Sequence, residues 1–347
     1  MATDLHTIHL VVPGLLGPMP TFSQLGDPLP CPILERLLSR SRVTSYGGTD
    51  VESVLCGLFG ITVEERENLP TAAYRRLGDG GDADDRYWLQ LTPVYLRPDQ
   101  DRLLLFDAED LQLTAEEAQA FAQLFNSHFT EEGWQVEVRH PHRWYFSLPS
   151  TPSLKTYELA DVFGRNMDMF LPEGEQGIRW HGVLNEIQML FYAADINSRR
   201  EDAGKGPVSG LWLSGGGKLS QPVQTHLTTV YGDTPLLRGL AMYAGSPPLP
   251  LPERSEELLD RHGELLVCYD RLQRSVLCAD PFGWKDQVLQ FENWMQPLAD
   301  AIKAKRLHAL QLYPCNGYRY QVDRGGLRRF WRRSLPLAQQ LDSNQLR

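Results

Sequence analysis

The chain has 347 residues, of which 42% are hydrophobic and 22% are charged, and its formal net charge is −10. This length accommodates one large domain or two domains with a sizeable core. The acidic balance disfavours a general nucleic-acid-binding protein, whose charge is usually positive, and no apolar run reaches the ~20 residues that span a membrane.

The cysteine pattern and the N-terminal residues indicate a cytoplasmic protein. The five cysteines are dispersed along the chain, and none forms a Cys-x-x-Cys pair. This spacing argues against a disulfide framework and against a zinc site built on cysteine. The first residues lack the basic start and the cleavage motif of a signal peptide. We therefore expect reduced cysteines in a cytoplasmic protein.

The first part of the chain predicts one strand followed by two helices. Residues 6–12 form an apolar run that ends at a Pro-Gly pair, which is typical of a buried strand. Apolar residues at helical spacing predict helices at 33–41 and 51–59. A glycine-rich charged stretch at 78–86 predicts a loop.

The middle of the chain predicts an α+β unit. Thr114 and Glu117 form a capping-box signature ahead of apolar residues three and four positions apart, which predicts an amphipathic helix. Around this helix, strand-like segments occur at 87–95, 102–106, 134–139 and 144–148.

The remaining sequence alternates helices with strands. Helices are predicted at 178–197, 235–244 and 284–304, and strands at 210–213, 265–269, 307–313 and 318–322. Such alternation favours an α/β core with a mostly parallel sheet. We place this core in residues 1–65 and 205–347, and an inserted α+β domain in residues 66–204.

One segment, residues 197–217, combines arginines, a Gly-Pro turn, a short strand and three consecutive glycines. Glycines after a strand allow a backbone to approach a ligand closely, and arginine suits phosphate. The sequence therefore predicts an anion-binding site at Arg200, Gly215, Gly216 and Gly217. The alternative is a simple strand-to-loop turn beside a solvated helix end.

The same segment resembles the archaeal-type cofactor-independent phosphoglycerate mutases of the alkaline phosphatase superfamily. In that family a His-Pro-x-Asn element precedes an arginine, a Gly-Pro turn, a strand and a glycine-rich loop. Asn197, Arg200 and the glycines match this pattern, whereas the His-Pro pair is missing. Residues 161–165 resemble a further element, Asp-Ile-Thr-Gly-Lys, with Arg165 in place of the lysine.

More closely, the whole chain resembles a bacterial group of mutase-like proteins, some of which are called RpfE-type regulatory proteins. The resemblance implies an alkaline-phosphatase-like α/β core sheet flanked by helices and interrupted by an inserted domain. It also adds Asn197 and Arg165 to the predicted anion-binding residues.

The resemblance further implies a degenerate metal site. The mutases use two divalent metals and a phosphorylated serine. Their first strand ends in Asp-Gly, where this chain has Pro13 and Gly14. Their late Asp-x-x-Gly-His-Asp element corresponds to residues 280–286, in which Trp284 replaces the histidine and Lys285 follows it. An indole N–H cannot coordinate a metal.

The serine that would carry the phosphoryl group is not distinguished by the sequence. The candidates between residues 25 and 53 are Ser39, Ser41, Ser45 and Ser53.

We therefore expect a mutase-like protein that has lost metal-dependent catalysis, needs no cofactor or metal, and binds a protein partner or a small anionic metabolite. The alternative is an active metal-dependent phosphoryl-transfer enzyme, of mutase or phosphatase type, with a rebuilt site. Such an enzyme would hold Mn²⁺, Mg²⁺ or Zn²⁺ on Asp270, Asp280 and Asp286.

A third hypothesis is a nucleic-acid-associated protein that uses the basic and aromatic tract at residues 324–333. The acidic chain instead favours a C-terminal helix that packs Leu327, Phe330 and Trp331 on the core and leaves its arginines in water. Nucleic acid is therefore the partner that we expect least.

Overall fold

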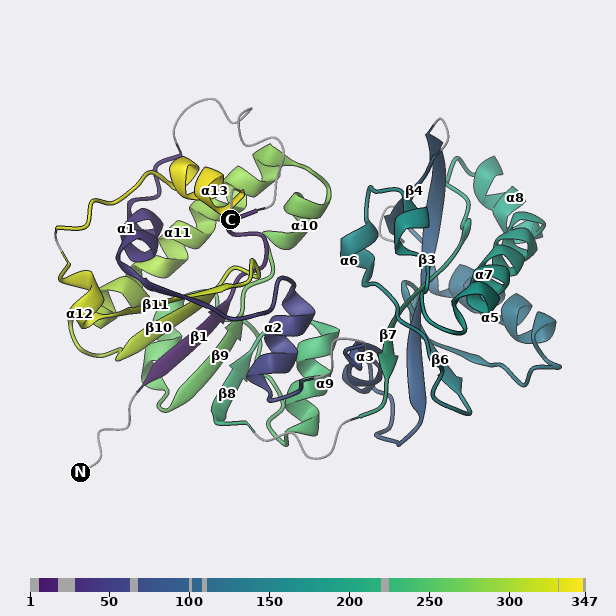
Figure 1. Cartoon of the computed structure of the whole chain (residues 1–347), viewed down its shortest axis with the longest axis horizontal. Coiled ribbons are helices and arrows are strands. Elements are labelled where there is room, and N and C mark those ends of the chain that lie inside the picture. Colours follow the sequence, from purple (N-terminus) through teal and green to yellow (C-terminus); the bar gives the residue numbers. More distant parts are fainter. Residues whose placement is uncertain are drawn as a thin grey trace. The chain divides into compact units, whose positions relative to one another are not determined.

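The computed structural model describes residues 6–17, 29–62, 68–99, 102–107, 111–219, 225–329 and 331–345, and the statements below concern these residues. The chain divides into two compact units (Figure 1), Met1–Ile61 with Val223–Arg347, and Thr62–Pro222. The chain thus leaves the first unit, builds the second, and then returns.

The first unit is built on a six-stranded sheet with the order β2-β11-β10-β1-β9-β8. Its strands are β1 (Thr7–Val11), β2 (Arg42–Ser45), β8 (Leu227–Tyr231), β9 (Glu264–Cys268), β10 (Ala309–Tyr313) and β11 (Tyr318–Asp323). The central strand β1 is parallel to both β9 and β10, and β8 is parallel to β9. Strand β11 pairs antiparallel with β10, and the edge strand β2 pairs antiparallel with β11.

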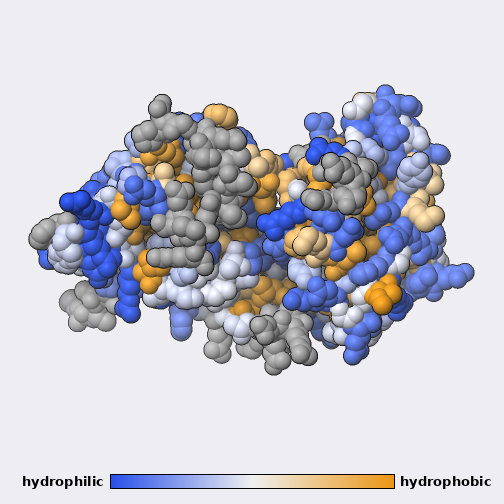
Figure 2. Space-filling model, turned by 45° about the horizontal axis from the view of Figure 1, so that its top comes forward, coloured by the Kyte–Doolittle hydropathy of each residue, from blue (hydrophilic) through white to orange (hydrophobic). Residues whose placement is uncertain are grey.

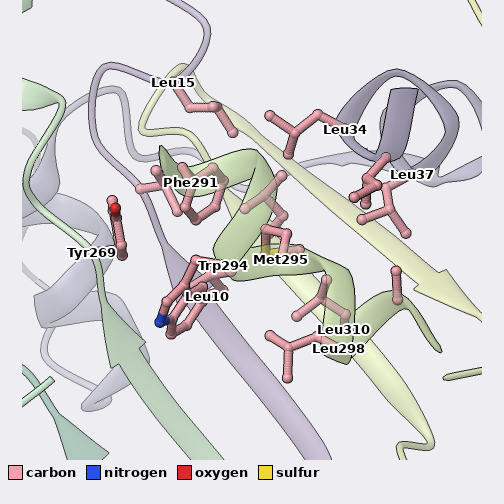
Figure 3. Packing of buried hydrophobic residues seen from close by; sticks show 14 of the residues in the cluster. Leu10, Leu15, Leu34, Leu37, Tyr269, Phe291, Trp294, Met295, Leu298 and Leu310 are labelled. Atoms are coloured by element: carbon pink, nitrogen blue, oxygen red, sulfur yellow. The ribbon is translucent and has the colours of Figure 1, made fainter. Parts of the chain in front are cut away.

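Helices cover both faces of this sheet, which explains why every residue of β1 is buried. The helices of the unit are α1 (Pro32–Arg40), α2 (Val51–Leu58), α9 (Pro235–Tyr243), η3 (Ser255–Asp260), α10 (Gln273–Leu277), α11 (Pro281–Lys303), α12 (Arg324–Leu327) and α13 (Leu337–Gln345). In the main core, apolar residues of α11 and α1 pack on strands β1 and β10, as Figure 3 shows for Phe291, Leu34 and Leu10. Helix α2 contacts α9 and β1 on the other face.

The start of α1 depends on a carboxylate from α11. The N-cap residue Cys31 provides no side-chain cap, and a proline occupies the first turn. Glu292 supplies the missing acceptor, because its two carboxylate oxygens accept the backbone N–H groups of Ile33 at 2.6 Å and Leu34 at 2.9 Å. Glu292 is only 5% exposed, so this cap joins two helices far apart in the sequence.

Replacing this carboxylate is expected to destabilise the first unit. Glu292→Ala leaves two backbone N–H groups buried without acceptors, which costs about 2 kcal/mol or more of unfolding free energy. Urea unfolding followed by tryptophan fluorescence measures this change. Gln290→Ala, at an exposed position of the same helix, is the matched control. Equal midpoints for the two variants would contradict the capping role.

The second unit is an antiparallel sheet with the order β4-β3-β6-β5, and β7 also pairs with β3. Its strands are β3 (Tyr87–Asp99), β4 (Arg102–Asp107), β5 (Val136–His140), β6 (Arg143–Leu148) and β7 (Gly210–Gly217). Its helices are α3 (Thr71–Gly78), α5 (Ala115–His128), α6 (Leu159–Val162), η2 (Met167–Phe170), α7 (Gly177–Tyr192) and α8 (Asp195–Asp202). Helices α5 and α7 pack on the sheet through a core that includes Phe121, Trp144, Trp180 and Leu213. The capping box at Thr114 and Glu117 is confirmed.

The compact units have different boundaries from those of the predicted core and inserted domain. The predicted boundary at residues 204–205 falls inside the second unit, which extends to Pro222. The reason is strand β7, which pairs with β3 and contributes Leu211 and Leu213 to the core of the second unit.

Two helix predictions are corrected. The helix expected at 178–197 is divided into α7 and α8, because the backbone of Ala194 adopts an extended conformation between them. The expected C-terminal helix ends at Leu327. Leu327 is buried, but Trp331 is 69% exposed and does not pack in the core, while Phe330 lies outside the described residues. Within the described residues, no helix has the length and hydropathy that crossing a membrane requires.

Candidate functional site

The carboxyl edge of the six-stranded sheet is the candidate site. Strands β1, β8, β9 and β10 are parallel, so the segments that follow them meet at one edge. Ligands of open α/β sheets bind outside this edge. The segments there include Gly14 after β1, Asp233 after β8, Asp270 after β9 and Cys315 after β10.

At this edge, the indole of Trp284 lies against the end of β1. Trp284 is 0% exposed and belongs to the main core. Its Nε1–H donates to the carbonyl oxygen of Gly14 at 2.8 Å. Gly14 has φ +82°, and a Cβ atom there would lie 2.9 Å from the Val276 side chain. Tight packing therefore occupies the position where the resemblance places the ligands of the mutases.

Asp280, which matches the family element, acts as a helix cap. It is the N-cap residue of α11, and its Oδ1 accepts the backbone N–H of Gly283 at 3.0 Å. A Cβ atom at Gly283 would collide with the carboxylate of Asp280. Capping of the first turn of α11 therefore explains both the aspartate at position 280 and the glycine at position 283.

The other two predicted carboxylates have different surroundings. Asp270 follows β9, where burial and then the charge of Asp233 raise its pKa, partly offset by its own backbone N–H and by Arg271. Asp286 is exposed on α11. Among the residues that the structure describes, no three His, Cys, Asp or Glu side chains are arranged to hold a metal ion.

The fold adds a group that sequence reasoning missed, namely Glu52, Cys268 and Cys315. Burial, followed by the charges of Asp270 and Glu52, raises the pKa of the Cys268 thiol. Burial, Cys268 and Glu52 likewise raise the pKa of Cys315. Both thiols are therefore protonated at neutral pH and are poor nucleophiles and metal ligands. Cys268 ends β9 and Cys315 follows β10, the two strands on either side of β1, and this placement is the signal that predicts the grouping of the two thiols.

The hydroxyl groups of the candidate serines Ser39, Ser41 and Ser53 form hydrogen bonds within the fold. The hydroxyl of Ser53 donates to the Asp50 carboxylate at 2.8 Å, beside the cap of α2. The buried Ser41 donates to the carbonyl of Leu37 at 2.7 Å. Ser39 accepts the backbone N–H of Leu335 at 2.9 Å, and Ser45 lies on the edge strand β2.

Arg200, the centre of the predicted anion site, is buried in the second unit with 1% exposure. Its guanidinium donates to the Glu117 carboxylate at 2.7 Å and to the carbonyl of Leu111 at 2.6 Å. It also donates to the carbonyl of Gly206 through two nitrogens, at 3.0 and 2.9 Å. An anion at this guanidinium would have to displace these acceptors, which join α8 to the start of α5.

Asn197 and Arg165 have separate partners. Asn197 is buried, donates to the carbonyls of Phe191 and Val208, and accepts the backbone N–H of Val208 at 2.8 Å. This side chain fixes the return of the chain from α8 towards β7. Arg165 is exposed, and its guanidinium lies 6.0 Å from the ring centre of Phe170.

The three glycines form the end of strand β7, which corrects the prediction of a loop. Gly215 has φ +67°, and a Cβ atom there would collide with the Thr71 hydroxyl and lie 2.9 Å from the backbone nitrogen of Ala72. A Cβ atom at Gly217 would lie 2.5 Å from Pro70. The absence of side chains thus allows the start of α3 to pack closely on β7.

A pair of glycine variants tests this packing role. Gly215 and Gly204 have similar φ angles, +67° and +71°, but no heavy atom lies within 4 Å of a Cβ atom at Gly204. Gly204→Ala is expected to cost about 1 kcal/mol of unfolding free energy from backbone strain. Gly215→Ala adds overpacking and is expected to cost ~2 kcal/mol more. Equal losses in urea unfolding would contradict the close approach of α3.

A second series tests the indole at the carboxyl edge of the first unit. Trp284→Phe leaves the Gly14 carbonyl without its donor and is expected to cost about 1 to 2 kcal/mol of unfolding free energy. Trp284→Ala opens a cavity and is expected to cost about 4 kcal/mol. Phe282→Ala, at a 69% exposed position of the same helix, is the control and is expected to change little. If Trp284→Ala unfolds like Phe282→Ala, the indole is not a core element.

Comparison with known proteins gives low-identity relatives. No family model matches the chain. The chain is similar to the 2,3-bisphosphoglycerate-independent phosphoglycerate mutase of Methanosarcina acetivorans, with 22% identity over 158 residues that cover 43% of this chain and 35% of that protein. The corresponding protein of Methanosarcina barkeri is 28% identical over 92 residues, which cover 24% of this chain and 23% of that protein. The chain therefore spans about a third or less of the length of these curated relatives.

Two solved structures resemble the chain over most of its length. The PH0037 protein from Pyrococcus horikoshii matches with a TM-score of 0.53 and 12% identity, over 92% of this chain and 88% of that chain. The cofactor-independent phosphoglycerate mutase from Thermoplasma acidophilum gives a TM-score of 0.48 and 14% identity, over 99% of this chain and 98% of that chain. The likeness to the Pyrococcus protein is a likeness of fold, and it confirms the predicted α/β core sheet flanked by helices. The mutase-like relationship in sequence is present at low identity.

Proposed function

We propose that this chain is a phosphoglycerate-mutase-like protein that has lost metal-dependent catalysis and acts by binding. The observation that carries this proposal is the buried Trp284, whose indole N–H bonds to the Gly14 carbonyl at 2.8 Å. The indole stands where the resemblance places a metal-binding histidine. Gly14 and Pro13 stand where it places the first aspartate.

The chemistry of the remaining groups supports the same proposal. Two-metal phosphoryl transfer needs several anionic or imidazole ligands that converge on each ion. Asp280 already accepts the backbone N–H of Gly283 as a helix cap. The raised pKa of Asp270 opposes the carboxylate form that a metal requires. Lys285 adds positive charge on the first turns of the same helix.

For the bound molecule, we propose a protein partner in the cytoplasm. The guanidinium of Arg200 is directed into the second unit, so a small anionic metabolite would compete there with Glu117 and two carbonyl oxygens. Figure 2 shows hydrophobic patches on a mostly hydrophilic surface, and exposed apolar side chains commonly mark protein interaction sites. A regulatory role, as in the bacterial group that the sequence resembles, is consistent with such binding.

Enzyme assays test the loss of catalysis. The purified chain is assayed for phosphoglycerate mutase and phosphatase turnover with Mn²⁺, Co²⁺, Mg²⁺ and Zn²⁺ in turn, beside an Asp280→Ala variant. We expect the wild type and the variant to show the same background rate with every metal. Calorimetric titration with Mn²⁺ provides a second readout, and we expect no saturable heat.

The rival enzyme hypothesis predicts the opposite result. If Asp270, Asp280 and Asp286 form a rebuilt site, turnover is robust with at least one metal and disappears in Asp280→Ala. Because Asp280 also caps α11, the rival requires a further check. Asp280→Asn keeps a cap acceptor, so loss of turnover in this folded variant would establish a catalytic carboxylate and overturn the proposal.

A further inference from the structure

Helix α7 presents large apolar side chains to solvent, opposite its buried face. Trp180, Leu184 and Ile187 point into the core of the second unit. On the exposed side, Ile178 is 86% exposed, Met189 74% and Tyr192 89%. Exposed hydrophobic residues are ordinary when scattered, but several large ones on one face of a helix indicate an interaction surface.

These exposed residues follow the spacing of a helix-pairing seam. Together with Gly182 and Asn185, which are also exposed, they occupy positions separated alternately by four and three residues. This is the spacing of the side chains that meet in two-stranded helix pairs. We call Ile178, Gly182, Asn185, Met189 and Tyr192 the α7 stripe. A Cβ atom at Gly182 would meet no heavy atom within 4 Å, so another helix backbone has room to approach there.

The charged residues beside the stripe indicate which molecule binds to it. Arg179 and Glu186 are both exposed and follow Ile178 and Asn185 by one position, so they lie on the same edge of the stripe. When two copies of α7 pair in antiparallel orientation, Ile178 meets Met189 of the partner subunit. The same register places Arg179 near Glu186 of the partner subunit, and the two-fold axis repeats both contacts.

We propose that the α7 stripe is the contact surface of an antiparallel homodimer. Gly182 and Asn185 then lie opposite one another near the axis, and Tyr192 extends past the start of the partner's helix. Antiparallel pairing also sets the positive end of each helix dipole beside the negative end of the other. The surface is therefore complementary to itself in shape, hydropathy and charge, as a two-fold interface requires.

The partly exposed carboxylate of Glu186 supports this pairing. The Glu186 carboxylate accepts a hydrogen bond from His128 Nε2 at 2.7 Å, and its side chain remains 53% exposed. It can therefore also receive a cationic partner. A contact made mainly by one 16-residue helix is smaller than a standard interface, so we expect reversible dimerisation at about micromolar concentrations.

Sedimentation velocity of the full chain over a series of micromolar concentrations tests the dimer. We expect the wild type to shift from monomer to dimer as the concentration rises. Arg179→Glu and Glu186→Arg each place like charges opposite one another twice, so each variant is expected to be at least tenfold weaker in dimerisation. The double variant restores opposite charges, and an equimolar mixture of the two single variants is expected to form heterodimers.

Two further variants separate the stripe from general surface hydrophobicity. Ile178→Asp is expected to remove dimerisation while leaving the circular dichroism spectrum unchanged. Met169→Glu, at a 75% exposed position on η2 of the same unit, is the control and is expected to dimerise like the wild type. A monomeric wild type, a dimer that survives Ile178→Asp, or a double variant that stays monomeric would overturn the proposal.

Discussion

The hydrogen bond from the Trp284 indole to the Gly14 carbonyl is the interaction on which the first unit depends. It joins the start of α11 to the turn that follows the central strand β1. Since α11 supplies much of the main core and also the carboxylate that caps α1, the position of α11 determines the packing of one face of the sheet. The fully buried indole at this edge therefore contributes stability to the first unit.

The second unit shows how a functional-looking segment can serve the fold. Arg200 bonds to Glu117 and to two backbone carbonyls, and so holds the turn after α8 against the start of α5. Gly215 and its neighbours allow α3 to pack on β7. If one partner of a buried ion pair is removed, the charge of the other is left uncompensated. This cost is a sufficient physical reason for an arginine at position 200.

The sequence predicts those elements whose signal is local. The apolar runs of β1, β9 and β10 and the capping box before α5 lie where the pattern places them. The edge strand β2 is not predicted, because it is polar and exposed and forms only by pairing with β11. Helix α3 is not predicted either. The glycines of β7 have low strand propensity, and tertiary pairing with β3 overrides it. The burial of Arg200 depends on Glu117, 83 positions away, which no local pattern reveals.

The central claim is that the residues at the carboxyl edge of the six-stranded sheet stabilise the fold and do not bind catalytic metal ions. Anomalous diffraction from crystals of the full chain grown with Mn²⁺ tests it most directly, because the signal locates the ion independently of any assay. The account predicts no anomalous peak within coordination distance of Asp270, Asp280 or Asp286. A strong peak bound by two of these carboxylates would contradict it.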